Sequence, residues 1–285
     1  MRLLHRKVGF ALLLASLPLA NAHAFGFDVI GAVGTMGKMA KGATKVDLQE
    51  ELAMGRQFSG MILGAFAPSH NAALNTYVSQ IGLTVAQASV RPDMDYHFQV
   101  ISARDSSGAP IVNAFSTPGG FIFITEGLIK SLNSEAALAG VLAHEVAHVA
   151  EKHVIKEIHR NNVKSGLLEL GGNVASSAGG VAGEISSVLS SALVSNLFEK
   201  GLDKGDEYRA DAAAVAYVSK AGYDPRGLVI FLQTIEAKEG KNYSTLLRTH
   251  PKPQDRIARI EKLIKDKKIS SEGKQTLADR WKRSS

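Results

Sequence analysis

Two histidines spaced four residues apart form the pattern in this chain with the clearest chemical potential. They are His144 and His148, with Glu145 between them, inside an apolar run from Ala136 to Val149. Residues four apart share one face of an α-helix, so both imidazoles can bind one metal ion while the carboxylate lies beside it. This HExxH pattern is typical of zinc proteases, in which the glutamate activates a water molecule. It therefore predicts a zinc-dependent hydrolytic site.

The surrounding residues predict that the pattern lies on a helix. No proline occurs from 133 to 164, Asn133 is a candidate N-cap, and Glu135 suits the first turn. Apolar residues recur at helical spacing: Leu138, Val141, Leu142 and Val149. The alternative is a pair of hydrogen-bonded helix histidines with a solvated glutamate.

Catalytic zinc needs a third protein ligand. Glu207 and Asp211 lie four residues apart at the start of a predicted helix, so they share a face. The first could bind the metal, and the second could accept the far N–H of a ligand imidazole. The alternative is a solvated acidic helix start. His153 lies about 140° around a continuous helix from His148, so we expect His153 and His159 at the surface.

Four blocks of the sequence resemble metallopeptidase family forty-eight. The resemblance covers about residues 46–265, and its blocks are VLAHEVAH at 141–148, EYRAD at 207–211, His250-Pro251 with Arg256-Ile257, and Asn113-Ala114-Phe115 followed by Pro118-Gly119-Gly120. It implies zinc ligands, a catalytic base and a hydrogen-bond partner of a ligand histidine. These are His144, His148 and Glu207 as the ligands, Glu145 as the base, and Asp211 as the partner.

Two further roles are hypotheses. The resemblance places the His250 loop over the metal, where His250 could stabilise the oxyanion or could replace the water and block catalysis. The alternative is a histidine that caps a helix before Pro251. The strand Asn113, Ala114, Phe115, if it has a free edge, could hold an extended substrate by backbone pairing; the alternative is a plain hairpin.

Several elements must position these residues. Helical spacing predicts helices over 46–64 and 69–88. Alternation predicts a strand over 96–101, and two further strands are expected over 111–115 and 121–125. We therefore expect an α+β fold, mostly helical: a zincin-like metalloprotease domain with a small antiparallel sheet beside the HExxH helix. Residues 165–205, rich in Gly, Ala and Ser, predict a small-residue helix that is either a mobile lid or a packed helix.

The two ends of the chain differ from the middle. Residues 1–24 resemble a cleaved signal peptide, because a basic start precedes an apolar stretch of about 13 residues, too short to span a membrane. We expect a flexible leader over 25–45, the zinc metallopeptidase domain over 46–265 and a basic C-terminal tail over 266–285. The tail could touch anionic lipid, but we expect it to be solvated and partly frayed. The chain has no cysteine, which excludes disulfides and thiolate zinc sites.

These expectations define a zinc endopeptidase of the bacterial periplasm, with one Zn²⁺ per chain and a further association with the outer membrane as a hypothesis. Some family branches carry transmembrane helices that are missing here, which favours the soluble periplasmic branch. The expected substrates are unfolded or mis-assembled envelope proteins, in a quality-control role. We expect no nucleic-acid partner, because aromatic residues are not interleaved with basic ones. The alternative is a chaperone-like interaction protein whose zinc site is latent and blocked by His250.

Overall fold

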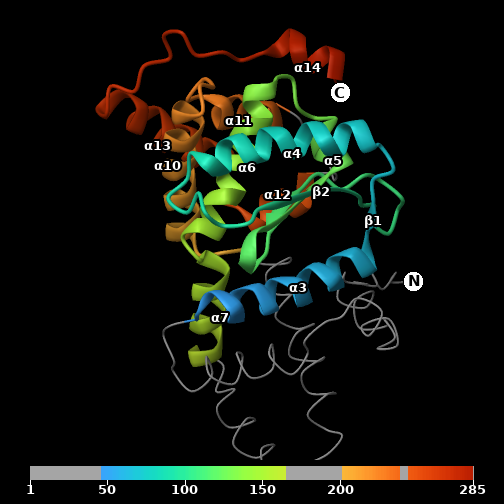
Figure 1. Ribbon diagram of the computed structural model, residues 1–285. Coiled ribbons are helices and arrows are strands. Elements are labelled where there is room, and N and C mark those ends of the chain that lie inside the picture. The colour runs from blue at the N-terminus through green and yellow to red at the C-terminus, as the bar shows by residue number, and fades with distance from the viewer. Residues whose placement is uncertain (1–45, 165–200, 238–242, 285) are drawn as a thin grey trace, which may run out of the picture.

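The computed structural model describes residues 46–164, 201–237 and 243–284 (Figure 1). The expected signal peptide, the leader and nearly all of the expected small-residue helix lie outside these ranges. The elements are α3 (Leu48–Ala65), β1 (Ala67–Pro68), α4 (Ala72–Gln87), β2 (His97–Ser102), β3 (Ala114–Ser116), η3 (Pro118–Gly120), β4 (Phe121–Thr125), α5 (Glu126–Ile129), α6 (Glu135–Ala150), α7 (His153–Lys164), α10 (Lys204–Lys220), α11 (Gly227–Glu236), α12 (Ser244–Thr249), α13 (Pro253–Asp266) and α14 (Ala278–Ser284). The described chain is thus mostly helical with a small sheet, as expected.

The sheet is mixed, so the expectation of an antiparallel sheet is wrong. Its four strands lie in the order β1-β2-β4-β3. β3 and β4 are antiparallel and are joined by the predicted turn, in which Gly119 and Gly120 have φ angles of 75° and 95° that favour glycine. β2 and β4 are parallel, with His97 opposite Phe121. The expected antiparallel sheet did not foresee this arrangement, in which β4 inserts between β2 and β3.

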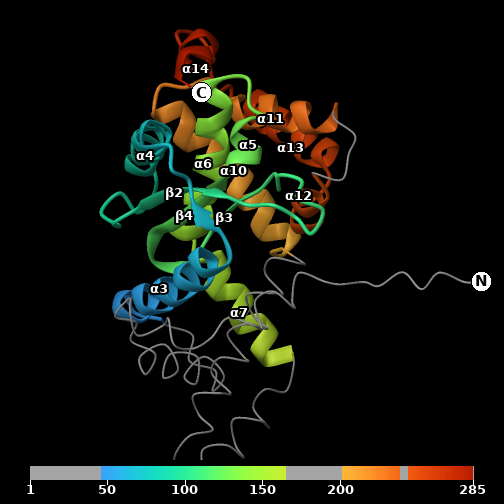
Figure 2. The same ribbon diagram turned by 90° about the vertical axis from the view of Figure 1, so that its right-hand side faces the viewer.

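The two faces of the sheet pack on different helices. Alternating strand residues Val100, Ile122 and Ile124 belong to the large core with α4 and α6, whereas Ile101 and Phe123 pack with Ile62 of α3. Period-two alternation explains this division, because successive strand side chains point to opposite faces. Figure 2 accordingly shows the strands between α4 and α6 on one side and α3 on the other.

The central helix α6 carries the HExxH pattern and is buried along its whole length. Ser134, rather than the expected Asn133, is its N-cap, because the Ser134 side chain accepts a hydrogen bond from the Ala137 N–H. Gly140 lets α11 cross at close range, since a Cβ atom at Gly140 would lie 2.3 Å from the backbone nitrogen of Leu228. A helix without a polar face can be stable only when other elements surround it.

The C-terminal segment packs against the start of α6, so the expectation of a frayed tail is wrong for the described part of it. Trp281 of α14 is buried and donates its indole N–H to the Leu132 carbonyl at 3.2 Å. Arg280 pairs with the fully buried Glu135. Tyr223 also donates to Glu135, at 2.7 Å between its hydroxyl and Oε1, and Tyr77 donates to the other oxygen. Basic composition alone suggested a solvated end, but these pairs anchor it.

None of the helices within the described ranges is long and apolar enough to cross a membrane.

The Glu135 cluster predicts a pH-dependent contribution to stability. Although burial opposes it, hydrogen bonds from Arg280, Tyr77 and Tyr223 hold the pKa of Glu135 below its usual value. We expect Glu135→Gln to lower the free energy of unfolding by about 1–3 kcal/mol at neutral pH, because an amide offers fewer acceptors to three donors.

This contribution should be complete above the unfolded pKa of about 4.3 and should disappear as pH falls through the lower folded pKa. Urea titrations of the wild type and Glu135→Gln at neutral pH and at about pH 3.5 measure the difference. The gap between the two proteins should narrow at the acidic pH. A constant gap would contradict the role of the carboxylate.

Candidate metal centre

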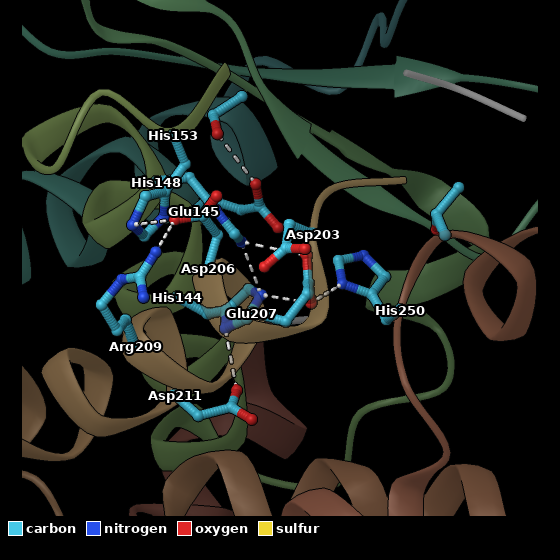
Figure 3. A network of polar contacts seen from close by, with 12 residues as sticks. His144, Glu145, His148, His153, Asp203, Asp206, Glu207, Arg209, Asp211 and His250 are labelled. Carbon is cyan, nitrogen blue, oxygen red and sulfur yellow. Dashed lines mark hydrogen bonds and ion pairs between the residues drawn. The ribbon is translucent and has the colours of Figure 1, made fainter. Parts of the chain in front are cut away.

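Three side chains from α6 and α10 converge on one another (Figure 3). The Nε2 atoms of His144 and His148 are 2.9 Å apart, and each lies 3.5 Å from an oxygen of Glu207. Their potential ligand atoms all lie within 4.8 Å of one another, and the three residues are buried. These are the three ligands that the family resemblance implied, and the structure brings them together.

The residues fit a divalent metal ion. Two imidazole nitrogens and one carboxylate oxygen are a donor set of catalytic zinc sites. Glu207 Oε1 is buried without a hydrogen-bond partner among the described residues. Such an oxygen is unfavourable unless a cation or a donor approaches it. The arrangement therefore implies a metal.

Asp211 lies behind His144, as expected for the partner of a ligand histidine. Its Oδ1 atom is 3.0 Å from His144 Nδ1. A carboxylate only accepts hydrogen bonds, so this contact places the proton on Nδ1 and leaves Nε2 directed toward His148 and Glu207. Arg256 in turn binds both Asp211 oxygens, with nitrogen to oxygen distances of 2.7 and 3.0 Å.

The protonation equilibria show that this centre is suited to positive charge. Despite burial and the charge of Arg256, hydrogen bonds to Asp211 and Glu207 raise the pKa of His144 to about 9. Burial and the neighbouring His144 hold the pKa of His148 well below its usual range. Although burial opposes ionisation, His250 and His144 hold the pKa of Glu207 well below its usual range. One cationic charge between the two imidazoles is therefore favourable.

Glu145 lies beside this centre but is not one of the three residues whose potential ligand atoms come together. It is buried, and burial raises the pKa of its carboxyl above the usual range. Ser116 of β3 donates a hydrogen bond to Glu145 Oε2 at 3.0 Å. A carboxyl with a raised pKa can both take and return a proton, which a general base needs.

His250 contacts the centre through Glu207. It is the C-cap of α12, and its Nδ1 atom is 2.6 Å from Glu207 Oε2. The close approach of Gly201 to the Thr249 backbone holds this loop beside the start of α10, because a Cβ atom at Gly201 would lie 1.8 Å from the Thr249 carbonyl oxygen. His250 is both a helix cap, the alternative interpretation, and a neighbour of the candidate ligands.

A pocket connects the centre with strand β3. Glu145, His148, Glu207 and His250 line it together with residues 113–117. In the described sheet β3 pairs only with β4, so its other edge is not covered by a strand. Asn113 Oδ1 is buried without a hydrogen-bond partner among the described residues. The expected strand, Asn113, Ala114 and Phe115, therefore lies beside the candidate metal centre.

The expectation that His153 and His159 lie at the surface is wrong. His153 is fully buried and its Nδ1 atom is 3.0 Å from His148 Nδ1, whereas His159 is half-buried. The reason is a break in the helix: α6 ends at Ala150, and Lys152 adopts a left-handed φ of 57° before α7 begins. The 140° angle applied only to a continuous helix, and the break returns His153 to the side of His148.

Sequence reasoning also missed roles for Ser116, Asp206 and Arg256. Ser116 contacts Glu145, and Arg256 contacts Asp211. Arg256 belongs to one of the four family blocks, and Ser116 directly follows the proposed substrate strand. Their positions in the sequence could therefore have indicated that both lie near the site. Asp206 is adjacent to Glu207 and is fully buried, but a single acidic residue at a helix start gives no signal of burial.

A HExxH helix beside a small mixed sheet, with a carboxylate from a second helix, defines a zincin-like metallopeptidase fold. The chain belongs to peptidase family M48, whose family model matches residues 72–264. This range contains all the residues that converge at the candidate centre.

Several curated relatives are similar to the chain. It is 23% identical over 248 residues to the beta-barrel assembly-enhancing protease of Escherichia coli K12, covering 84% of this chain and 48% of that protein. It is 24% identical over 239 residues to the protein of that name from Yersinia pestis, covering 81% and 46%. It is 27% identical over 211 residues to the mitochondrial metalloendopeptidase OMA1 of Schizosaccharomyces pombe, covering 72% and 57%. The chain thus spans about half the length of these relatives.

The buried pair of Asp211 and Arg256 predicts a large stability effect. We expect Asp211→Asn to lower the free energy of unfolding of the metal-free protein by about 3–5 kcal/mol, because Arg256 would keep a buried charge without its counter-charge. Adding Arg256→Met should recover part of that loss. Chemical denaturation followed by circular dichroism measures both changes.

The control is the half-exposed pair of Arg226 and Glu261, with a 2.7 Å nitrogen to oxygen distance. Glu261→Gln should cost about 1 kcal/mol or less, because solvent screens exposed pairs. Equal losses in Asp211→Asn and Glu261→Gln would show that the buried pair has no special importance.

Proposed function

We propose that this protein is a zinc-dependent endopeptidase. The observation that supports the proposal most strongly is the convergence of His144, His148 and Glu207, with Glu145 beside them in the same pocket. The first three residues would hold one Zn²⁺ per chain, and Glu145 would be the catalytic base. Family membership and the names of the relatives, which are proteases, agree with this activity.

The zinc ion, when bound, supplies Lewis acidity that lowers the pKa of a water molecule to about 7 and polarises the substrate carbonyl. Glu145 would accept the proton of the attacking water and later deliver it to the leaving nitrogen. Ser116 orients the Glu145 carboxylate through its hydrogen bond to Oε2. Asp211 would keep the His144 proton on Nδ1, so that Nε2 would stay available to hold the metal.

Substrate would lie along β3. An extended peptide can add to the uncovered edge of a strand through backbone hydrogen bonds. The Asn113 side chain offers a buried acceptor in the same pocket, and Ala114 and Phe115 continue along it. Backbone pairing is largely independent of side chains, which supports broad cleavage of extended polypeptides with weak sequence preference.

The cellular role follows from the kind of substrate that can reach this pocket. A folded protein rarely offers a free extended segment, so unfolded or mis-assembled polypeptides are the proposed substrates. The relatives named beta-barrel assembly-enhancing protease support a role in envelope protein quality control. The proposed compartment is the periplasm, reached through a cleaved signal peptide, with peripheral contact to the outer membrane as a further part of the proposal.

His250 would act on the same reaction. Its loop is held next to α10, and its ring is hydrogen-bonded to Glu207. In this position it would donate to the negative charge that develops on the substrate carbonyl oxygen. The other hypothesis, a His250 that blocks the site and leaves a chaperone-like function, predicts the opposite effect of its removal.

Replacement of the base should abolish proteolysis. We expect Glu145→Gln to lower kcat/KM for casein at least about 100-fold, because an amide cannot accept the proton of the attacking water. Removal of metal with a chelator should have the same effect on the wild type, and Zn²⁺ should restore activity. The control is Glu236→Gln, which changes an exposed glutamate of α11. Full activity in Glu145→Gln would refute the proposed function.

Removal of the His250 imidazole distinguishes its two roles. We expect His250→Ala to lower kcat about 100-fold while zinc content stays the same, because a donor to the oxyanion is lost. Steady-state kinetics with a fluorogenic peptide measure the change. Leu247→Ala, an exposed residue of α12, controls for disturbance of that helix. A rise in activity would support the blocking role instead, and no change would exclude both.

A further inference from the structure

His148 Nδ1 faces a second histidine, whereas the Nδ1 atom of His144 faces the carboxylate of Asp211. His148 Nδ1 lies 3.0 Å from Nδ1 of His153, the first residue of α7 (Figure 3). His153 is fully buried. Its other nitrogen, Nε2, is 3.2 Å from Glu151 Oε2 and 3.3 Å from Asp206 Oδ1. Thus each nitrogen of His153 has a defined neighbour.

The neighbours of His153 determine where its proton lies. Both groups near Nε2 are carboxylate oxygens, which only accept hydrogen bonds, so Nε2 carries a proton. In the neutral imidazole, Nδ1 is then an acceptor. A neutral His153 therefore accepts the Nδ1 proton of His148, and this leaves the lone pair of His148 Nε2 directed toward His144 and Glu207.

We propose that His153 is a positioning residue that keeps His148 in the tautomer and orientation required of a metal ligand. The inference rests on the metal centre proposed above and adds a residue to it. The order of donation is from His148 Nδ1 to His153 Nδ1, and from His153 Nε2 to the acidic pair of Glu151 and Asp206. We call this series of contacts the histidine relay.

Asp206 anchors the far end of the histidine relay. It is fully buried at the first turn of α10 and pairs with Arg160 of α7 and Arg209 of α10. The guanidinium groups of Arg160 and Arg209 carry only donors and contact one oxygen each, so Asp206 acts as an acceptor toward both. A charged Asp206 accepts and never donates, which keeps the direction of the relay fixed.

The two candidate ligand histidines are thus oriented by different elements. His144 is held directly by Asp211 of α10, whereas His148 is held by His153 of α7. Asp206 lies next to the candidate ligand Glu207 in sequence and pairs with α7, so a shift of α7 would move both the relay and the third ligand. The relay therefore makes the docking of α7 on α10 a determinant of metal affinity.

Nitrogen NMR of the zinc-loaded wild-type protein, with ¹⁵N-labelled histidine, tests the relay directly. We expect His153 to be neutral with its proton on Nε2, and His148 to carry its proton on Nδ1 with Nε2 bound to zinc. A His153 proton on Nδ1 in the zinc-loaded protein would overturn the proposal, because Nδ1 could then not accept from His148. This measurement needs no variant and does not depend on activity.

Zinc affinity of two variants provides the second test. His153→Phe keeps a ring but removes the acceptor, and we expect its zinc dissociation constant, measured against a chromophoric chelator, to rise about 10–100-fold. His153→Asn places an amide oxygen near the position of Nδ1 and should keep the affinity within about threefold of the wild type. Ile158→Val, at a fully buried residue of α7, controls for packing and should bind zinc as the wild type does.

The outcomes separate the relay from the proposed function. A wild type that binds no zinc would overturn the metal centre itself. Zinc binding by the wild type with unchanged affinity in His153→Phe, or with equal losses in the Phe and Asn variants, would overturn the relay alone. If His153→Phe does not fold, as judged by circular dichroism, the NMR experiment and the Asn variant still decide the question.

Discussion

Buried charge between α6 and α10 is the constraint on which the rest of the structure depends. Glu207, Asp211 and Asp206 are all buried on α10, and burial alone disfavours their charged forms. Each is nevertheless held ionised by close cationic or hydrogen-bonding partners, of which Arg256 for Asp211 is the clearest. Because an unpaired buried charge costs several kcal/mol, the folded state requires these partners to be in place together. The same requirement fixes the side chains that the chemistry needs.

The apolar frame makes this concentration of charge possible. α6 is surrounded on all sides, with α4 and the sheet on one side and α10 and α11 on the other (Figure 1). Close crossing at Gly140 brings the backbones of α6 and α11 together. In such a buried interior electrostatic interactions are stronger than in water, so each carboxylate has a large effect on its neighbours. The packing that stabilises the fold therefore also strengthens the electrostatic interactions of the centre.

The sequence predicted the parts of this centre that follow from helical periodicity. His144 and His148 share a face because they are four residues apart, and so do Glu207 and Asp211. The strand expected over 121–125 matches β4. Strand order could not be predicted in this way, because the insertion of β4 between β2 and β3 depends on pairing between distant segments. The pairs of Asp206 with Arg160 and of Arg256 with Asp211 were missed for the same reason, since the partners lie about 45 residues apart in the sequence.

The largest error concerned a single backbone angle. Lys152 has a φ of 57°, which no residue pattern in the helix indicated, because lysine rarely adopts this conformation. That one residue ends α6 and redirects the chain, and it converts His153 from an expected surface residue into a buried neighbour of His148. The Lys152 side chain is itself paired with the buried Glu51 of α3 at 2.9 Å. The contact with α3 stabilises the residue at the helix break, so a helix remote in sequence contributes to the position of a candidate metal ligand.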